Sequence, residues 1–443
     1  MTSQISRRTL LKGAAAGTAL VIAGPVLESR AVASSTAAAG PGTRPFPRLP
    51  AGTESFPQIK HVVVLMMENH SFDNHLGALR RRGVDGLTFN DSGQATNSNP
   101  SASGGTVSSL PAPSTCQASY RISQSWDASH RSWDYGANDG FVKACGPESM
   151  YYYGEAQLAY YYALASTFPV CDRYFCSVMA QTYPNRRFLI AGSAFGQVSD
   201  PLPSPTDPDP RPSGFGTIFD MLNAFGISWK DYFADLPTAG LFPYVVEQNP
   251  DKVVQVADFF ADCAGGTLPF FSLVDPESFE GSEENPQDVQ SGAYYAYRVI
   301  DAVTKSPAWG STVLILTFDE HGGYYDHVPP VPAVRPDGIV PAVGSDTYGD
   351  LYSWTGFRVP TVVVSPWARP NFVSHTVYDH TSILRLIETK WNLPALSARD
   401  ANANNMLDCL DLHRAAFLTP PNLTPASVPT GVPACMAADP TGQ

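Results

Sequence analysis

Two apolar runs of the sequence, 61–67 and 312–318, each end in a pair of carboxylate or amide residues: Glu68 and Asn69, then Asp319 and Glu320. In open α/β sheets ligands bind at the carboxyl ends of strands, so the two pairs predict one shared site. Oxygen donors suit a hard cation such as Ca²⁺, Mg²⁺ or Mn²⁺. The alternative is ordinary polar residues leaving a strand. The second pair and the glycine turn after it favour a site.

A threonine stands before an apolar helical stretch in the middle of the chain. Thr182 lies where the N-cap of that helix is expected, and Pro184 suits its first turn. A hydroxyl at a helix N-terminus meets a positive dipole that favours phosphate, and metal coordination would help ionise it into a nucleophile. From position alone, a plain structural cap is the commoner explanation.

Four histidines are further candidates for chemistry. His321 and His327 flank a Gly-Gly-Tyr-Tyr-Asp segment, which invites a zinc interpretation, whereas loop histidines bonded to backbone are the alternative. His130 and His380 lie elsewhere in the chain, and spacing alone favours a structural role for each. A histidine beside an attacked phosphate could protonate the leaving oxygen.

The elements that must position these residues alternate between strands and helices. Strands are expected at 61–67, 270–274, 312–318 and 361–365, and helices at about 154–166, 185–192, 215–224, 291–304 and 379–391. Continuous apolar runs suit strands buried on both faces of a parallel sheet. The alternation predicts an α/β fold with a mainly parallel sheet. The tyrosine clusters 151–153 and 160–162 favour core packing, with a lipid- or aryl-binding cleft as the alternative.

The N-terminal residues 1–33 have the order of a twin-arginine export signal. Arg7 and Arg8 precede an apolar stretch, and Ala31 to Ala33 form a small-x-small cleavage site. The stretch is too short and too rich in Ala and Gly to be a good membrane anchor. We therefore expect recognition by the twin-arginine export machinery and a secreted or extracytoplasmic enzyme.

Composition along the chain predicts its domain boundaries, and its charge excludes one class of partner. Residues 34–56 are expected to be a linker, 57–395 one catalytic domain, and 396–443 a C-terminal tail packed on it, while 90–119 and 200–214 suit surface insertions. The formal net charge of −13 argues against a nucleic-acid partner, because phosphate backbones need a basic face.

The seven cysteines leave at least one thiol free. Outside the cell, Cys116–Cys145 and Cys409–Cys435 are plausible disulfides. Free buried thiols explain the cysteines equally well, since a sequence cannot fix connectivity.

Five motifs in order resemble the bacterial and plant non-specific phospholipase C family, which includes related acid phosphatases. Met67 to Asp73 resembles its E-N-R-S-F-D signature and 317–329 its second signature. The segment 182–186 is similar to its nucleophile segment, 358–367 to its late strand and 380–383 to its closing helix. Two departures stand out: His70 replaces the usual Arg, and Asn285 lies where the family often has the His of a His-Pro pair.

The resemblance implies an alkaline-phosphatase-like three-layer sandwich, with helices on both faces of a mainly parallel central sheet. It implies one divalent metal, Ca²⁺ before Mg²⁺ or Mn²⁺, held by five ligands: Glu68, Asn69, Thr182, Asp319 and Glu320. Thr182 would also be the nucleophile and form a phosphothreonine. Four residues would act on the substrate or wall the site: His130 on phosphate oxygens, His327 and His380 near the leaving group, and Asn285 as a substrate contact.

The expected activity is hydrolysis of phosphate esters, as a phospholipase C on phospholipids or an acid phosphatase on small monoesters. An acidic surface disfavours anionic membranes but permits brief contact with a zwitterionic lipid surface. A non-catalytic phosphate- or metal-binding surface protein is the alternative of another class, which Asn285 keeps open. A sulfatase-like enzyme is disfavoured, because Thr182 cannot become formylglycine.

Overall fold

A central sheet organises the part of the chain that the computed structural model describes, which is residues 38–429 and Cys435 without 121, 205–208, 212–215, 278–280 and 344–351. The predicted export signal lies outside these residues. The sheet has eight strands in the order β12 (Val373–Ser374), β6 (Val170–Cys171), β11 (Val362–Val364), β10 (Thr312–Phe318), β1 (His61–Met67), β9 (Phe271–Val274), β7 (Trp229–Phe233) and β8 (Val253–Gln255). The strands from β10 to β8 are parallel.

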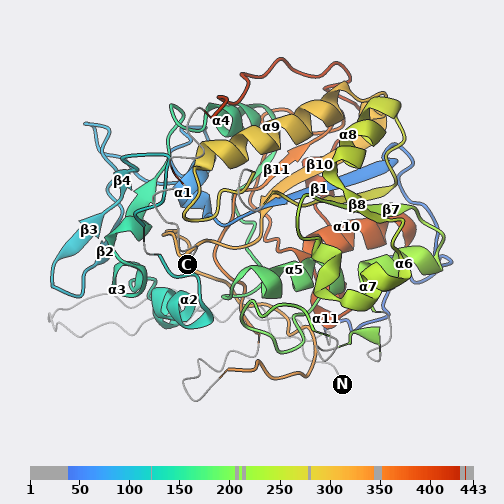
Figure 1. Cartoon of the computed structure of the whole chain (residues 1–443), viewed down its shortest axis with the longest axis horizontal. Coiled ribbons are helices and arrows are strands. Elements are labelled where there is room, and N and C mark those ends of the chain that lie inside the picture. The colour runs from blue at the N-terminus through green and yellow to red at the C-terminus, as the bar shows by residue number, and fades with distance from the viewer. Residues whose placement is uncertain are drawn as a thin grey trace, which may run out of the picture. The chain divides into compact units, whose positions relative to one another are not determined.

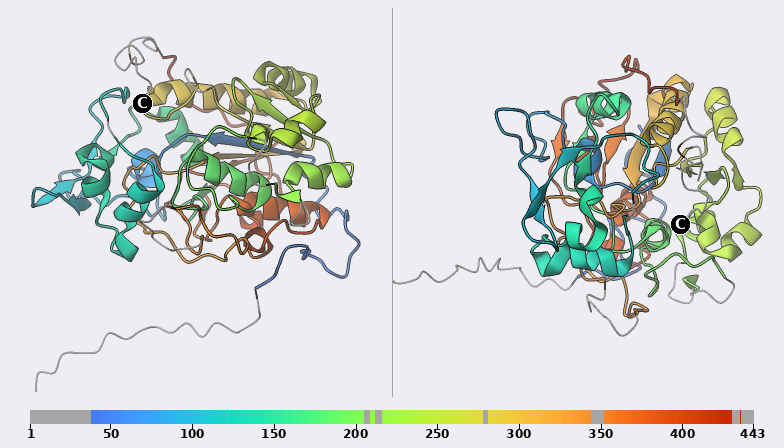
Figure 2. Two further views of the ribbon diagram at one scale, coloured as in Figure 1. Left: turned by 60° about the horizontal axis from the view of Figure 1, so that its bottom comes forward. Right: turned by 60° about the vertical axis from the view of Figure 1, so that its left-hand side comes forward.

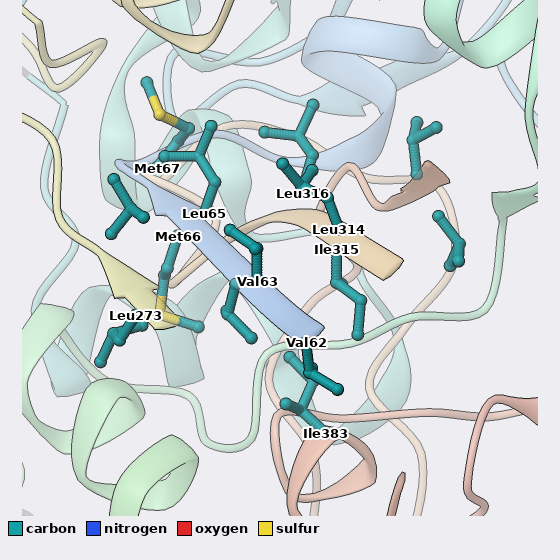
Figure 3. Close-up of a cluster of buried hydrophobic side chains, with 14 of the residues drawn as sticks. Val62, Val63, Leu65, Met66, Met67, Leu273, Leu314, Ile315, Leu316 and Ile383 are labelled. Atoms are coloured by element: carbon teal, nitrogen blue, oxygen red, sulfur yellow. The ribbon is translucent and has the colours of Figure 1, made fainter. Parts of the chain in front are cut away.

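Strands β1 and β10 form the middle of the sheet because their residues are apolar on both faces. Every residue of β10 is buried, as is every residue of β1 after His61. Their side chains pack with Leu273 of β9 and Ile383 of the helix below (Figure 3). The parallel register places Met67 beside Phe318, so both strands end at the same level.

Helices cover both faces of this sheet. Helices α4 (Ala159–Thr167), α8 (Val256–Gly265) and α9 (Val289–Lys305) lie on one face. Helices α5 (Thr182–Ala191), α6 (Ile218–Ala224) and α10 (Thr381–Trp391) lie on the other (Figures 1 and 2). The predicted three-layer α/β arrangement is confirmed, and the predicted strands agree with the observed ones to within one residue at each end.

One strand runs against the expected direction. Strand β11, expected at 361–365 among the strands of a parallel sheet, is antiparallel to β10 and to β6. A continuous apolar run reports burial on both faces and carries no information on strand direction. The connections on either side of the strand set its direction.

The segment 98–152 forms a separate layer, here called the wing (Figure 1, cyan and teal). It contains β2 (Ser98–Pro100), β3 (Thr106–Ser108), β4 (Leu110–Pro111), α2 (Trp126–Trp133), α3 (Phe141–Cys145) and β5 (Tyr151–Tyr152). The expectation of a plain surface loop at 90–119 is therefore wrong, since three short strands lie there. Trp133, Phe141 and Met150 form a second core, the core of the wing, together with Met179, Tyr325 and Phe357 from outside the segment.

The tyrosine clusters contribute to the cores. Tyr153, Tyr160, Tyr161 and Tyr162 are all buried and belong to the main core, and Tyr152 belongs to the core of the wing. Core packing therefore accounts for these rings. None of them lines the large cavity described below.

One end of the described chain is attached to the sandwich and the other to the wing. In the segment predicted as a linker, Phe46 N donates to Asn392 Oδ1 (2.9 Å), and Asn392 Nδ2 donates to three carbonyls of residues 46–50. At the other end Cys435 forms a disulfide with Cys116. No helix of the described residues is long and apolar enough to cross a membrane.

Both suggested disulfides are wrong. Cys145 is a buried free thiol, and the Cys409 sulfur lies 3.7 Å from that of Cys171. The chain path brings residue 435 back to residue 116, which no spacing in the sequence could reveal.

Candidate active site

The carboxyl ends of three neighbouring strands bring acidic residues together. Because Met67 and Phe318 are in register, Glu68 and Asp319 leave β1 and β10 side by side, and Asp319 N donates to Met67 O (3.0 Å). Strand β9 ends at Val274, so Asp275 follows at the same edge. The predicted meeting of the two strand-end pairs is what the structure shows, with a third carboxylate added.

Thr182 enters this group from the N-terminus of α5. It is the first helical residue, and Gln181 is the N-cap, which corrects the prediction that Thr182 itself is the cap. Its hydroxyl is therefore not used on the helix backbone. Thr182 Oγ1 lies 3.4 Å from Asn69 Oδ1, to which it donates, and the residue is 7% exposed.

Arg186, one helical turn after Thr182, is the positive charge among these carboxylates. It contacts one carboxylate from each of the three strand ends: Glu68 (2.8 Å), Asp275 (2.9 Å) and Asp319 (3.2 Å). Burial opposes the charge, but the three carboxylates outweigh it and raise the pKa of Arg186. Arg186 is thus a charged anchor that fixes the strand ends.

Acidic groups at the site outnumber its cation. Burial raises the pKa of Asp319 and of Glu320 well above the usual range, and nearby carboxylates add to the effect. Glu320 Oε2 accepts from Gly322 N (2.7 Å), while Glu320 Oε1 is buried with no hydrogen-bond partner among the described residues. A second cation would satisfy this orphaned oxygen, so the donor set fits a divalent metal.

A hydrogen-bonded chain leads from Asn69 to a further carboxylate. Asn69 Nδ2 donates to Gln124 Oε1 (3.0 Å), and Gln124 Nε2 donates to Glu284 Oε1 (3.0 Å). Burial and then the charge of Glu68 raise the pKa of Glu284 to about 8. Asn285, the predicted substrate contact, is the next residue and is half-buried, whereas Glu284 lines the cavity.

A cavity of about 300 Å³ opens onto part of this group: Glu68 and Thr182 line it, whereas Asn69, Asp319 and Glu320 do not. Polar residues line its floor: Glu68, Thr182, Arg186, Asp200, Asp275 and Glu284. Apolar residues line another part, among them Leu202 and Leu236, which are 79% and 59% exposed. The cavity therefore offers a hydroxyl group, acidic groups and an apolar rim to one ligand.

The predicted histidines lie away from the cavity that Glu68 and Thr182 line. His380 is buried and Nε2 donates to the carbonyl of Asp319 (2.7 Å), so it supports a strand end. His130 is buried in α2, with Nδ1 donating to Trp126 O (2.8 Å). His327 bonds Asp73 (2.6 Å) and Asp85 (3.1 Å). None of the three lines the cavity.

Several site residues escaped the sequence analysis. Asp275 follows a predicted strand, so the rule that identified Glu68 and Asp319 also applies to it. Arg186 stands four residues after Thr182, on the same helix face. Gln124 and Glu284 lie on irregular segments with no periodic signal.

Comparison with known proteins identifies the class. The Phosphoesterase family matches residues 59–394, and the chain belongs to this family. The membership confirms the family resemblance and the predicted reaction class, hydrolysis of phosphoric esters.

Individual relatives carry more specific names. Phospholipase C B of Mycobacterium tuberculosis is 32% identical, over 94% of this chain and 86% of the relative. Non-hemolytic phospholipase C of Pseudomonas aeruginosa is 30% identical over 76% of this chain, which spans about half (54%) of that relative's length. A solved protein of the alkaline phosphatase superfamily from Vibrio parahaemolyticus aligns with a TM-score of 0.40 at 12% identity, covering 82% of this chain and 72% of that one.

Proposed function

We propose that the chain is a phospholipase C-like phosphoesterase that uses Thr182 as its nucleophile and one divalent cation. The observation that carries this proposal is the Thr182 hydroxyl, placed on a cavity floor beside the carboxylates of two strand ends. A threonine that merely capped a helix would bond the helix backbone, and Thr182 does not occupy the cap position.

Five oxygen donors would hold the cation: Glu68, Asn69, Thr182, Asp319 and Glu320. Five protein donors suit Ca²⁺ better than Mg²⁺ or Mn²⁺, because Mg²⁺ keeps more of its water. The bound cation supplies positive charge that favours an ionised hydroxyl and a phosphate oxygen beside it. Arg186 keeps two of these carboxylates in position, and His380 fixes the backbone of Asp319.

Reaction proceeds through Thr182. The Thr182 hydroxyl loses its proton to water, its Oγ1 attacks phosphorus in line, the bond from Thr182 oxygen to phosphorus forms, and the bond from phosphorus to the alcohol oxygen breaks. Water then attacks the phosphothreonine and releases the phosphoryl group. Asn69 Oδ1 accepts from the hydroxyl in the resting protein and so orients it toward the cavity.

The lining of the cavity favours a phosphodiester with an apolar group. Leu202 and Leu236 stand exposed at its edge and suit brief contact with a lipid surface. The acidic floor repels the second negative charge of a monoester more than the single charge of a diester. Two relatives are named phospholipase C, which agrees with this choice.

Hydrolysis of para-nitrophenyl phosphorylcholine and para-nitrophenyl phosphate, with and without chelator, tests the proposal. We expect turnover of the diester that is lost on chelation and restored by Ca²⁺. Turnover of only the monoester would make the protein an acid phosphatase. Thr182→Ala should abolish turnover while Thr182→Ser keeps part of it. Mass spectrometry of acid-quenched enzyme should find phosphorylcholine on Thr182 with the diester, or phosphate with the monoester. A Thr182→Ala variant with full turnover would exclude this nucleophile.

A further inference from the structure

Ester cleavage in this cavity needs a proton for the departing alcohol oxygen. An alkoxide is a poor leaving group, and a positioned acid supplies its proton in the transition state. The predicted histidines do not line the cavity, and His380 Nε2 and His130 Nδ1 already donate to carbonyls. The donor must therefore be sought among the acidic residues of the cavity itself.

Three of the four carboxylates that line the cavity already form ion pairs or accept hydrogen bonds from the backbone. Glu68 pairs with Arg186. Asp275 accepts from Arg186 and from the backbone and hydroxyl of Thr238. Asp200 accepts from the backbone of Tyr183 (2.7 Å), at the start of α5. Arg186 engages Glu68 and Asp275, and Asp200 is held by the backbone at the start of α5, although burial raises the pKa of Asp200 to about 6.

Glu284 differs from these three. Unlike Glu68 and Asp275, it pairs with no lysine or arginine among the described residues, and unlike Asp200 it accepts from a neutral side-chain amide, that of Gln124, and not from the backbone of α5. The direction of that bond is fixed, because Asn69 Nδ2 donates to Gln124 Oε1 and so turns Gln124 Nε2 toward Glu284. Glu284 Oε1 is thus the acceptor oxygen, and a proton on this carboxyl group belongs on Oε2.

We propose that Glu284 is the general acid that protonates the leaving alcohol; this role rests on the proposed phosphoesterase function. As the bond from phosphorus to the alcohol oxygen breaks, its electron pair goes to that oxygen, which takes the Glu284 proton. The free alcohol and the Glu284 carboxylate result. In the second step the carboxylate takes a proton from the attacking water, and the bond from phosphorus to Thr182 breaks, so Glu284 ends protonated.

The surroundings of Glu284 agree with this role. The charged groups that face it are anionic on several elements, namely Glu68 after β1, Glu320 after β10 and Asp200. Burial is the larger influence on its pKa, which lies at about 8. Glu284 and Thr182 line the same cavity of about 300 Å³, so one phosphate ester can reach both.

The test compares leaving groups in Glu284→Gln. The amide keeps the size and the bond from Gln124 but carries no acidic proton. We expect kcat/KM for an alkyl ester, such as a short-chain phosphatidylcholine, to fall about 10²–10³-fold. The para-nitrophenyl diester, whose leaving group needs no proton, should lose less than about tenfold. The basic limb of the pH profile should disappear for the alkyl ester alone.

Controls separate this role from the proposed function. The exposed Glu247→Gln should leave both substrates unaffected. If Glu284→Gln lowers kcat/KM of both substrates equally, or of neither, the acid role of Glu284 is overturned while Thr182→Ala still reports on the nucleophile; kcat alone does not decide, because both substrates share the second step. If Thr182→Ala retains turnover, the proposed function itself fails.

Discussion

At the scale of single residues, the site depends on the balance between Arg186 and the carboxylates around it. One buried guanidinium touches Glu68, Asp275 and Asp319, which come from three different strands. Removing one partner from a buried set of charges leaves the others uncompensated, which costs far more than losing an exposed pair.

Arg186→Ala should therefore lower the free energy of unfolding by about 3–5 kcal/mol. Urea denaturation in chelator would measure it. The matched control is Arg131→Ala, which removes an exposed pair with Asp127 and should cost less than about 1 kcal/mol. Equal losses in the two variants would show that the contacts of Arg186 do not stabilise the fold.

His327 gives a prediction of pH dependence. Burial opposes its charge, but the bond and charge of Asp73 prevail and raise the pKa of His327 from 6.5 to about 9. Because this pKa is higher in the folded than in the unfolded protein, protonation of His327 stabilises the fold. The stabilisation is complete below pH 6.5 and is lost as the pH rises to about 9.

The free energy of unfolding should thus fall by about 2–3 kcal/mol more in the wild type than in His327→Asn between pH 6 and 9. Chemical denaturation of both proteins at three pH values would measure this difference in the free energy of unfolding. Parallel curves for the two proteins would contradict the prediction.

Residue types and strand ends predicted part of the site. Glu68 and Asp319 could be placed because the end of a buried strand is visible in the sequence, and Asp275 was available to the same rule. Gln124 and Glu284 could not be placed, since they come from irregular segments whose paths depend on tertiary packing.

At the scale of elements, the turn after β10 controls how closely Asn69 and Glu320 approach each other. Gly322 has φ +65°, and a Cβ there would lie 2.0 Å from Asn69 O. Its N–H also bonds Glu320 Oε2. The backbone of β1 and the turn after β10 thus touch where two predicted metal ligands stand.

Gly322→Ala should push the turn away from Asn69, and we expect at least a tenfold weaker Ca²⁺ affinity by calorimetry, by analogy with losses at supporting residues of metal sites. Gly310→Ala is the control, because a Cβ at Gly310 meets nothing within 4 Å. Unchanged affinity in Gly322→Ala would show that this contact does not position the ligands.

Elements were the most predictable level of the structure. The apolar runs predicted the full length of β1 and β10, because burial on both faces leaves a continuous apolar signal in the sequence. The direction of β11 and the strands of the wing were missed. Direction is a property of connections, and the wing strands are only two or three residues long.

At the scale of the whole molecule, the disulfide from Cys116 to Cys435 joins the wing to the C-terminal tail. It closes a loop with a sequence separation of 319 residues. Such a cross-link restricts the unfolded chain strongly, and native disulfides typically contribute about 2–4 kcal/mol.

The double variant Cys116→Ser/Cys435→Ser should lose about that amount of stability in urea denaturation, and reductant should lower the wild type to the same value. The variant Cys263→Ser keeps this disulfide, so reductant should lower its stability as it lowers that of the wild type, whereas the double variant should not respond to reductant. A double variant as stable as the oxidised wild type would show that the link does not restrict unfolding.

The wing has a consequence for how such enzymes diversify. It enters the chain between β1 and β6 and supplies none of the eight sheet strands, and its core is shared with Met179, Tyr325 and Phe357. Gln124 within it bonds Asn69 and Glu284. Insertions or exchanges in this segment would leave the register of the strand ends intact. Natural variation and laboratory recombination in this segment can therefore alter which esters are selected without moving the strand ends, as long as Gln124 and its two bonds are kept.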